Sequence, residues 1–388
     1  MSSFTYLACI GTRPEIIKMA PVYHALKARG KKVHLVHTGQ HETIATELYR
    51  FFDMQPDVVI DLKRKSAALS SLTAALLGGV EHALNTLQPN VVMVQGDTTS
   101  ALVGAMVSYY HNMPVAHVEA GLRTREREPF PEEKNRELIG RLAHWHFPPT
   151  PQARQNLRYE GINADRIFEV GNTVIDAAIW TRNHIAHKST DVASTMPSDL
   201  LAFLKKREDT RKILITAHRR ENWGVPIRNI AKAVARIVAL YPDVSAIWPI
   251  HPNPAVRANV QSELEQVAPA VLERICLTQP VGYSALIHLL DLCVFTLTDS
   301  GGIQEEASAF AKPVLIARNS TERQELVDAG GAVLVGTDVE CIMRHVKALL
   351  TDTAIYRSMQ VSQSPFGDGQ SASRIADVLA WEETKRTY

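Results

Sequence analysis

Short apolar runs alternate with longer segments of helical spacing along almost the whole chain, and this alternation limits the folds available to it. The runs have the length of strands, and the segments between them repeat apolar residues every three or four positions. Such a pattern predicts parallel sheets covered by helices on both faces, in an α/β protein. Strands are predicted at Thr5–Ile10, Lys32–His37, Val91–Gln95, Val115–Val118, Ile213–Thr216, Ser245–Pro249, Leu292–Leu297, Val314–Ile316 and Ala332–Val335.

The alternation pauses between about Gly171 and Arg211, where a helical stretch is followed by polar residues. This pause separates two α/β halves of similar size, so we expect two Rossmann-like domains with a cleft between them. In open α/β sheets, ligands bind beyond the C-terminal ends of the strands. Helices are predicted at Ile16–Arg29, Thr99–His111, Ile227–Tyr241 and Cys341–Leu350.

Composition excludes several classes of partner. The formal net charge of the 388 residues is +1, which favours neither nucleic acid nor an anionic membrane as a partner. No apolar window approaches the roughly 20 residues that a membrane helix needs. The four cysteines are scattered without a CxxC pair, which predicts buried, reduced thiols in a cytoplasmic protein.

Three common ligand motifs are missing from the sequence. There is no GxGxxG after the first predicted strand, no GxxxxGK[ST] and no HExxH. A dinucleotide fingerprint, a phosphate loop of the Walker type and a zinc-protease motif are therefore unsupported. We expect neither a cofactor nor a metal ion.

Charged residues follow the predicted strands of the first half. Arg13 and Lys18 lie near a predicted helix start, where two cations can bind a phosphate or a carboxylate. The alternative is an ordinary capped turn with charged residues at the surface. Asp97 comes after a predicted strand and a glycine, Glu119 follows the next strand directly, and Glu132 opens a helix. Asp97 and Glu132 are equally suited to capping a helix, whereas a carboxylate ending a strand usually has a partner or a task.

The second half repeats this arrangement with different side chains. His218 follows a strand and has arginines beside it, and His251 follows the next one. The turn Ser300-Gly301-Gly302 presents backbone N–H groups at a helix start and could hold a diphosphate. Glu305 and Glu306 are expected in the first turn of that helix, where a carboxylate could accept hydrogen bonds from sugar hydroxyls. Together these motifs predict acid/base chemistry on a phosphorylated substrate, such as a nucleoside-diphosphate sugar.

Eight stretches in this order carry a family resemblance: GTRPEIIKMAPV, QGDTTSAL, HVEAGLRT, PFPEEKNR, VGNTVIDA, TAHRREN, HPNP and TDSGGIQEEA. The chain closely resembles the non-hydrolysing bacterial UDP-N-acetylglucosamine 2-epimerases from about Ile10 to Gly369. The resemblance implies a GT-B-like fold with the active site in the interdomain cleft, and a homodimer. It also implies that the last helix, Ser371–Glu383, returns to the first domain. The domains are then 1–172 with 370–388, and 173–369.

The resemblance also implies an activity, the reversible conversion of UDP-GlcNAc to UDP-ManNAc by an isomerase. UDP leaves as the C2 proton is removed, giving 2-acetamidoglucal, and then adds back without help from a cofactor. Cell-envelope polysaccharide synthesis would use the product. The residues that match the family's catalytic positions are Asp97, Glu119, Glu132 and His218. Those that match its UDP-sugar contacts are Arg13, Lys18, His218, Ser300, Gly301, Gly302, Glu306 and Arg323.

One stretch departs from the family pattern. Many members are activated by a second UDP-GlcNAc, and the residues that match this allosteric site are Gln40, His41, Arg219, Arg220 and Glu221. Here Glu42 replaces a basic residue, so activation and the identity of the sugar stay open. The alternatives are a modified UDP-HexNAc substrate, a hydrolysing enzyme that releases ManNAc, and a glycosyltransferase or sugar-nucleotide-binding protein of the same fold.

Overall fold

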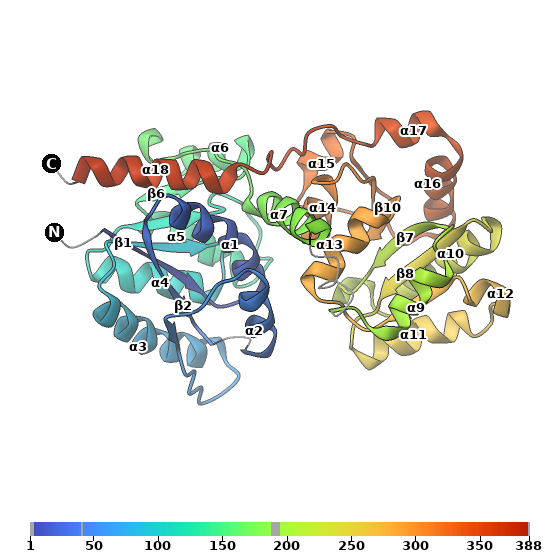
Figure 1. Ribbon diagram of the computed structural model, residues 1–388, viewed down its shortest axis with the longest axis horizontal. Coiled ribbons are helices and arrows are strands. Elements are labelled where there is room, and N and C mark those ends of the chain that lie inside the picture. Colours follow the sequence, from blue (N-terminus) through green and yellow to red (C-terminus); the bar gives the residue numbers. More distant parts are fainter. Residues whose placement is uncertain (1–3, 40–41, 188–194, 387–388) are drawn as a thin grey trace. The chain divides into compact units, whose positions relative to one another are not determined.

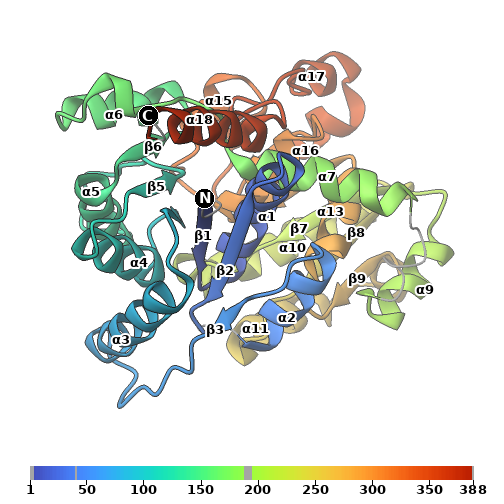
Figure 2. The same cartoon turned by 60° about the vertical axis from the view of Figure 1, so that its left-hand side comes forward.

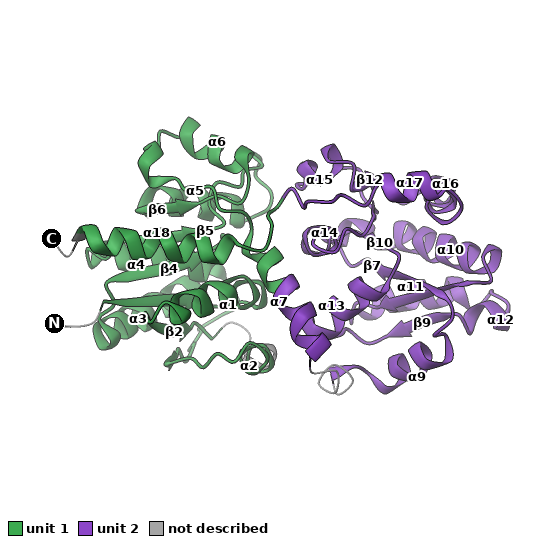
Figure 3. Cartoon of the chain, turned by 45° about the horizontal axis from the view of Figure 1, so that its top comes forward, with its two compact units in different colours: residues 1–177, 366–388 green, residues 178–365 purple. Residues whose placement is uncertain are grey.

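The computed structural model describes residues 4–39, 42–187 and 195–386, and the chain forms two compact units. Unit 1 comprises residues 1–177 and 366–388, and unit 2 comprises residues 178–365 (Figure 3). The chain therefore leaves unit 1 once and returns to it once. The sequence-based division places these two changes at 172/173 and 369/370, compared with 177/178 and 365/366 for the compact units.

Unit 1 contains a six-stranded sheet in the order β3-β2-β1-β4-β5-β6, and its described strand pairs are all parallel. The central strands β1, β4 and β5 are buried along their whole length, as continuous apolar runs of a parallel sheet require, whereas β2 is exposed at its first residue. The strands are β1 (Thr5–Ile10), β2 (Lys32–His37), β3 (Val58–Val59), β4 (Val91–Gln95), β5 (Val115–Val118) and β6 (Trp145–Phe147).

The last helix of the chain belongs to unit 1, where it packs on α1 (Figures 1 and 2). The Tyr6 hydroxyl donates to the Leu379 carbonyl at 3.2 Å and to Glu383 at 3.0 Å, while Arg29 pairs with Asp377 at 2.6 Å. The helices that lie wholly in unit 1 are α1 (Arg13–Ala28), α2 (Glu42–Phe51), α3 (Leu69–Leu87), α4 (Thr99–Tyr110), α5 (Glu132–Leu142), α6 (Pro151–Tyr159), η1 (Ala164–Arg166) and α18 (Ser371–Arg386). Helix α7 (Thr173–His187) begins in unit 1 and ends in unit 2.

Unit 2 repeats the architecture with a six-stranded parallel sheet in the order β12-β11-β10-β7-β8-β9. Its strands are β7 (Arg211–Thr216), β8 (Val244–Pro249), β9 (Ile275–Thr278), β10 (Phe295–Thr298), β11 (Val314–Ile316) and β12 (Ala332–Leu334). Its helices are α9 (Ser198–Lys206), η2 (Arg220–Asn222), α10 (Val225–Leu240), α11 (Pro254–Leu264), α12 (Pro269–Leu272), α13 (Tyr283–Leu292), α14 (Gly301–Ser308), α15 (Gln324–Asp328), α16 (Val339–Thr351) and α17 (Thr353–Ser358).

The predicted fold class, α/β with two Rossmann-like domains, is confirmed, and most predicted strands are found with few changes of boundary. The prediction of a strand from Leu292 to Leu297 was wrong at its start. Helix α13 extends through Leu292, and β10 begins at Phe295. The apolar residues continue without a break from helix to strand, so periodicity alone cannot separate the two. The short strands β3, β6 and β9 were missed.

Three of the four cysteines are buried, as predicted, and all four are free thiols. The exception is Cys341 in the first turn of α16, which is partly exposed. Within the described ranges, no helix is long and apolar enough to cross a membrane.

Candidate active site

In unit 1, three neighbouring strands end in loops that carry the predicted carboxylates and cations. Strands β1, β4 and β5 lie side by side, and parallel strands present their C-terminal ends at the same edge of the sheet. Arg13 begins α1 after β1, Asp97 lies in the turn after β4, and Glu119 follows β5 directly. The fold thus places these three predicted residues at one edge of one sheet.

Glu119 is held by donors from three different elements. Lys18 Nζ of α1 lies 2.5 Å from Glu119 Oε1, Gln95 Nε2 of β4 donates to Oε2, and Asn172 Nδ2 donates to Oε1 at 3.2 Å. The residue is 8% exposed, and its backbone is left-handed with φ of 63°, which is costly for a residue with a Cβ. Strain of this kind is concentrated at functional sites.

Asp97 forms an ion pair with Arg136 of α5. Arg136 Nε donates to Asp97 Oδ2 at 3.0 Å, and a second nitrogen of the same guanidinium also contacts that oxygen. Burial raises the pKa of Asp97 above its ordinary value, although Arg136 opposes this, and the nearby Glu119 raises it further. Asp97 is therefore a carboxylate whose proton affinity is increased by its surroundings, which suits an acid/base group.

Glu132 and Glu133, adjacent at the start of α5, have different environments. Glu133 is fully buried, accepts hydrogen bonds from the backbone of Thr124 and Arg125, and lies 3.2 Å from Arg136. Glu132 is half-buried, and no hydrogen bond or ion pair is formed by its side chain with the described residues. Glu133 thus stabilises the segment before α5, whereas the side chain of Glu132 is available to bind a ligand.

Glu15 connects the loops after β1 and β4. Its Oε2 accepts from the backbone of Gly11 and Thr12 in a capping box, and its Oε1 accepts from the Thr98 hydroxyl at 2.8 Å. Burial raises the pKa of Glu15 to about 7, because it outweighs these stabilising hydrogen bonds. Gly11 is required here, since a Cβ would lie 2.2 Å from the Thr38 hydroxyl. Arg13, two residues further on, is half-buried and has no partner among the residues described.

His117 fixes the turn that presents Asp97. Its Nε2 lies 2.7 Å from the carbonyl oxygen of Gly96, a residue with φ of 68°, so the ring donates to this carbonyl. The side chain is fully buried, and burial lowers the pKa of His117 to about 4. The histidine is therefore neutral near pH 7.

This lowered pKa predicts a dependence of stability on pH. The unfolded chain binds a proton at His117 below about pH 6.5, whereas the folded chain does so only below about 4. The contribution of His117 to stability is therefore fully present above pH 6.5 and is lost as the pH drops toward 4. We expect the free energy of unfolding, measured in urea, to fall between pH 7.5 and 5.0. This fall should be about 2 kcal/mol smaller in His117→Asn than in the parent. His82→Asn, at an exposed site on α3, should behave like the parent. If the free energy of unfolding fell as much in His117→Asn as in the parent, the lowered pKa of His117 would be refuted.

In unit 2, the loop after β7 is fastened to the end of β10 by Asp299. The carboxylate is fully buried and accepts from the backbone N–H groups of His218 and Arg219, both at 2.9 Å. It also accepts from Asn222 Nδ2 at 2.9 Å, and Asn222 in turn donates to the Ala317 carbonyl. Three donors converge on one carboxylate, so the position of the His218 loop depends on it.

His218 itself is 45% exposed at its side chain, stacked on His251 with ring centroids 6.1 Å apart. Burial lowers the pKa of His218, and the neighbouring His251 and Arg219 act in the same direction, while Asp299 raises it. Asp299 Oδ1 lies 3.5 Å from Nδ1 of the ring. The two strand-end histidines singled out from the sequence are thus brought together.

The Ser300-Gly301-Gly302 turn begins α14, as predicted. The Arg323 guanidinium lies over Gly301, where a Cβ would meet its Cζ at 3.0 Å, while a Cβ on Gly302 would meet nothing within 4 Å. Arg323 is held by Glu305 at 2.9 Å. Glu305 and Glu306 were expected in the first turn, but the helix begins at Gly301 and places both in the second turn, where they are buried.

The residues matching the allosteric site are only partly described. Gln40 and His41 lie outside the described residues. Arg219 lies 3.5 Å from Glu322, and Glu221 pairs with the buried Arg318 at 2.8 Å. Arg220 is exposed in η2. These contacts join the His218 loop to the segment before α15, and they leave an allosteric role as a prediction.

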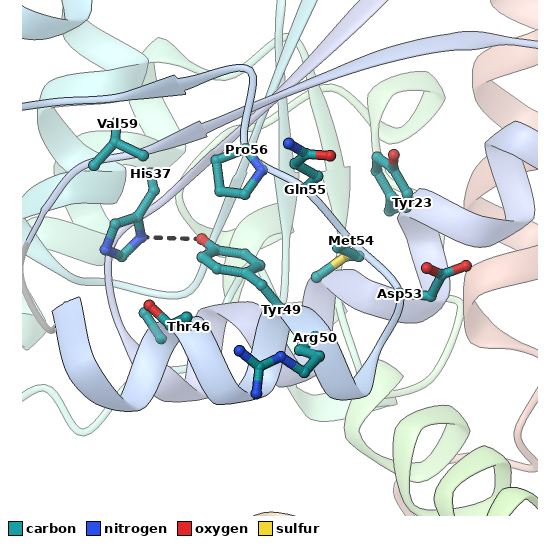
Figure 4. A pocket seen from close by; sticks show the side chains of 11 residues that line it. Tyr23, His37, Thr46, Tyr49, Arg50, Asp53, Met54, Gln55, Pro56 and Val59 are labelled. Atoms are coloured by element: carbon teal, nitrogen blue, oxygen red, sulfur yellow. Dashed lines mark hydrogen bonds between the residues drawn. The ribbon is translucent and has the colours of Figure 1, made fainter.

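A cavity of about 880 Å³ lies in unit 1 beside α2 (Figure 4). The Tyr49 hydroxyl is hydrogen-bonded to His37 Nδ1 at 3.0 Å inside it. Tyr23, Arg50 and Met54 are also part of its lining. None of the predicted site residues that the structure describes lines this cavity. Across the described ranges, no cluster of three or more His, Cys, Asp or Glu side chains could hold a metal ion.

Two Rossmann-like domains with polar strand ends define an α/β protein of the GT-B-like class. A family model described as UDP-N-acetylglucosamine 2-epimerase matches residues 24–380. The chain is 41% identical to the UDP-N-acetylglucosamine 2-epimerase of Yersinia pestis over 377 residues, which cover 96% of this chain and 97% of the relative. The chain belongs to the UDP-N-acetylglucosamine 2-epimerase family.

Further comparisons agree with this membership. The UDP-N-acetylglucosamine 2-epimerase of Escherichia coli strain K12 is 40% identical over 378 residues, covering 96% of this chain and 97% of that protein. The crystal structure of UDP-GlcNAc 2-epimerase from Neisseria meningitidis bound to UDP-GlcNAc matches with a TM-score of 0.86. It is 34% identical and covers 97% of this chain and 100% of that chain.

Proposed function

We propose that this protein converts UDP-GlcNAc reversibly to UDP-ManNAc by inverting C2, without net hydrolysis. Membership of the family supports the reaction at C2, and the relative from Neisseria meningitidis is described as bound to UDP-GlcNAc. The observation that carries the proposal is the pair of strand-end carboxylates in unit 1. Asp97 and Glu119 follow neighbouring strands, and each is held by a cation, Arg136 and Lys18 respectively.

The proposed reaction proceeds by elimination and addition. The C2 proton has no adjacent carbonyl to acidify it, so direct deprotonation would be very slow. Instead a carboxylate accepts the C2 proton while the C1–O bond to UDP breaks, which leaves 2-acetamidoglucal and UDP. UDP then forms the C1–O bond again, and a proton is delivered to the opposite face of C2. No net oxidation occurs, and the two faces require two differently placed acid/base groups.

We assign this acid/base work to Asp97, Glu119 and Glu132 as a set. Asp97 has a raised pKa, Glu119 is held by three donors, and Glu132 is half-buried at the start of α5. These are the environments that distinguish carboxylates with different tasks.

We assign the diphosphate to the turns of unit 2. His218 would stabilise or protonate departing UDP, and the Ser300-Gly301-Gly302 turn offers backbone N–H groups beside the Arg323 guanidinium. Glu306 would accept hydrogen bonds from hydroxyls of the UDP-sugar. Arg13 and Lys18 of α1 would contribute positive charge from unit 1. A homodimer, a cytoplasmic location and a role in cell-envelope polysaccharide synthesis are part of the same proposal.

The reaction is tested by incubating the protein with UDP-GlcNAc in D₂O and following the products by proton NMR. We expect deuterium at C2 and a new UDP-ManNAc signal, with UDP retained on the sugar. Free ManNAc together with free UDP would instead identify a hydrolysing enzyme. The absence of C2 exchange with UDP-GlcNAc and with a panel of modified UDP-HexNAc sugars would refute C2 epimerisation. If the protein still bound UDP, the remaining alternatives would be a glycosyltransferase or a sugar-nucleotide-binding protein.

A further inference from the structure

Asn172 has no part in the steps above, yet its side chain contacts Glu119. The residue is 2% exposed, and Nδ2 lies 3.2 Å from Glu119 Oε1. Its Oδ1 accepts from the backbone N–H of Val174 at 3.1 Å, in the first turn of α7. Because only the amide oxygen can accept that bond, the NH₂ group must face Glu119. The orientation of the amide is thus set by the helix start.

The same residue also binds the segment that returns to unit 1. Its backbone N–H donates to the carbonyl oxygen of Phe366 at 2.6 Å. The two backbones pass close together, since a Cβ on Gly171 would lie 3.2 Å from Cα of Gly367 and 3.3 Å from the Phe366 carbonyl oxygen. Gly171 has φ of 93°, which glycine adopts without strain. Asn172 therefore connects the outgoing chain, the returning chain and Glu119.

We propose that Asn172 is a positioning residue that holds Glu119 as an ionised hydrogen-bond acceptor. Lys18 of α1 and Gln95 of β4 donate to the same carboxylate, so donors from distant parts of the chain converge on it. A carboxylate that accepts several hydrogen bonds is favoured in its charged form, which is the form that can take a proton. The inference rests on the proposed function, in which Glu119 acts at C2.

Titratable groups near Glu119 come from three segments of unit 1. Lys18 comes from α1, Asp97 from the turn after β4, and His117 from β5, the strand that Glu119 follows. His117 is neutral near pH 7, because burial lowers its pKa to about 4. Lys18 favours the ionised form of Glu119, whereas a negative charge on Asp97 opposes it. Asn172 also favours the ionised form of Glu119, because it donates a hydrogen bond and does not itself titrate.

The first test is Asn172→Ser. A serine can still cap α7 through its hydroxyl, but it is too short to reach Glu119. We expect kcat for C2 exchange to fall about ten- to a hundredfold, with KM within about threefold of the parent, because the carboxylate loses its fixed orientation. UDP affinity, measured by calorimetry, should be unchanged. A purely structural role would instead lower the melting temperature and leave kcat intact.

The second test is Asn172→Asp, which also keeps the acceptor for Val174. A second carboxylate beside Glu119 disfavours the ionised form of Glu119, so the acidic limb of the kcat/KM profile should move to higher pH by about one unit or more. An acidic limb at the parent's position would overturn the proposal. This readout separates positioning from stability, since a capping aspartate at a helix start is well tolerated.

The same two substitutions at Asn90 serve as the matched control. Asn90 lies before β4 at the opposite end of the sheet, where its Oδ1 accepts from the Thr5 N–H at 2.8 Å. Neither variant there should change kcat or the pH profile. An active parent with an unaffected Asn172→Ser would refute the positioning role and leave the epimerase proposal standing. If the parent is inactive on every sugar, the proposed function fails. The ionisation of Glu119, followed by ¹³C NMR and assigned with Glu119→Gln, then decides the positioning role: it should shift to higher pH in Asn172→Ser.

Discussion

Replacing Asp97 with asparagine is expected to lower kcat for C2 exchange about a thousandfold or more, with UDP affinity within about threefold of the parent. A positioned acid/base group contributes roughly 10²- to 10⁴-fold to a rate, and asparagine can neither accept nor deliver the C2 proton. The substitution keeps the size of the side chain and an oxygen that can still accept from Arg136. The loss should therefore be chemical, because the fold and the diphosphate contacts assigned to unit 2 are preserved.

The measurement is deuterium incorporation at C2, together with calorimetric titration by UDP. Asp243→Asn is the matched control, since Asp243 also pairs with an arginine, Arg211, at 2.7 Å. That pair is largely exposed in unit 2, so its loss should cost at most about 1 kcal/mol and leave kcat unchanged. An Asp97→Asn enzyme with nearly parental exchange would remove Asp97 from the catalytic set. A loss of UDP binding would mean that Asp97 maintains the structure of the binding site and that the fall in kcat is not evidence of proton transfer.

The sequence located the edge of the sheet where chemistry can occur, and the reason is local. Glu119 directly follows an apolar run, and Asp97 comes shortly after another; runs that form neighbouring parallel strands must end at the same edge. His218 and His251 were found in the same way in the second half. Such residues are predictable because strand ends are visible in the pattern of apolar residues, without knowledge of long-range contacts.

The partners of these residues could not be predicted from spacing. Arg136 is 39 positions from Asp97, and Asn172 is 53 positions from Glu119. Arg136 and Asn172 reach these carboxylates because α5 and α7 begin at that edge of the sheet. The residues around Asp97 and Glu119 do not indicate where those two helices begin. Glu133 illustrates the limit: the pair Glu132-Glu133 is visible in sequence, but only packing shows which one is buried beside Arg136.

Asp299 shows a further limit of local reasoning. The sequence placed it before a glycine turn suited to a diphosphate, whereas its carboxylate points to the loop after β7. It fixes His218 through that loop, at a separation of 81 positions. A signal was present in principle, because an acidic residue that ends an apolar strand usually needs partners. The identity of those partners depends on β7 and β10 pairing in parallel.

Substitution of Asp299 by alanine should therefore have the largest effect on stability, a loss of about 3–5 kcal/mol in the free energy of unfolding of unit 2. The substitution removes the fully buried acceptor of the His218 and Arg219 N–H groups, and it leaves the Asn222 amide with only the Ala317 carbonyl. Each unsatisfied buried donor costs about 1–3 kcal/mol, and part of this is recovered by relaxation of the loop and entry of water. Asp299→Asn should cost less, because an amide oxygen can still accept at the Oδ2 position.

Urea unfolding and the shift in melting temperature produced by UDP together test this expectation. A ligand that binds only the folded state raises the melting temperature, so a displaced His218 loop should reduce the shift caused by UDP. Asp338→Ala is the control, since Asp338 also accepts a backbone N–H in unit 2, from Cys341 at 2.8 Å. That bond caps α16 at the surface, and its loss should cost only about 1 kcal/mol without affecting UDP. If Asp299→Ala were no less stable than Asp338→Ala, Asp299 would not brace the loop. If it were unstable but bound UDP normally, His218 and its loop would lie outside the diphosphate site.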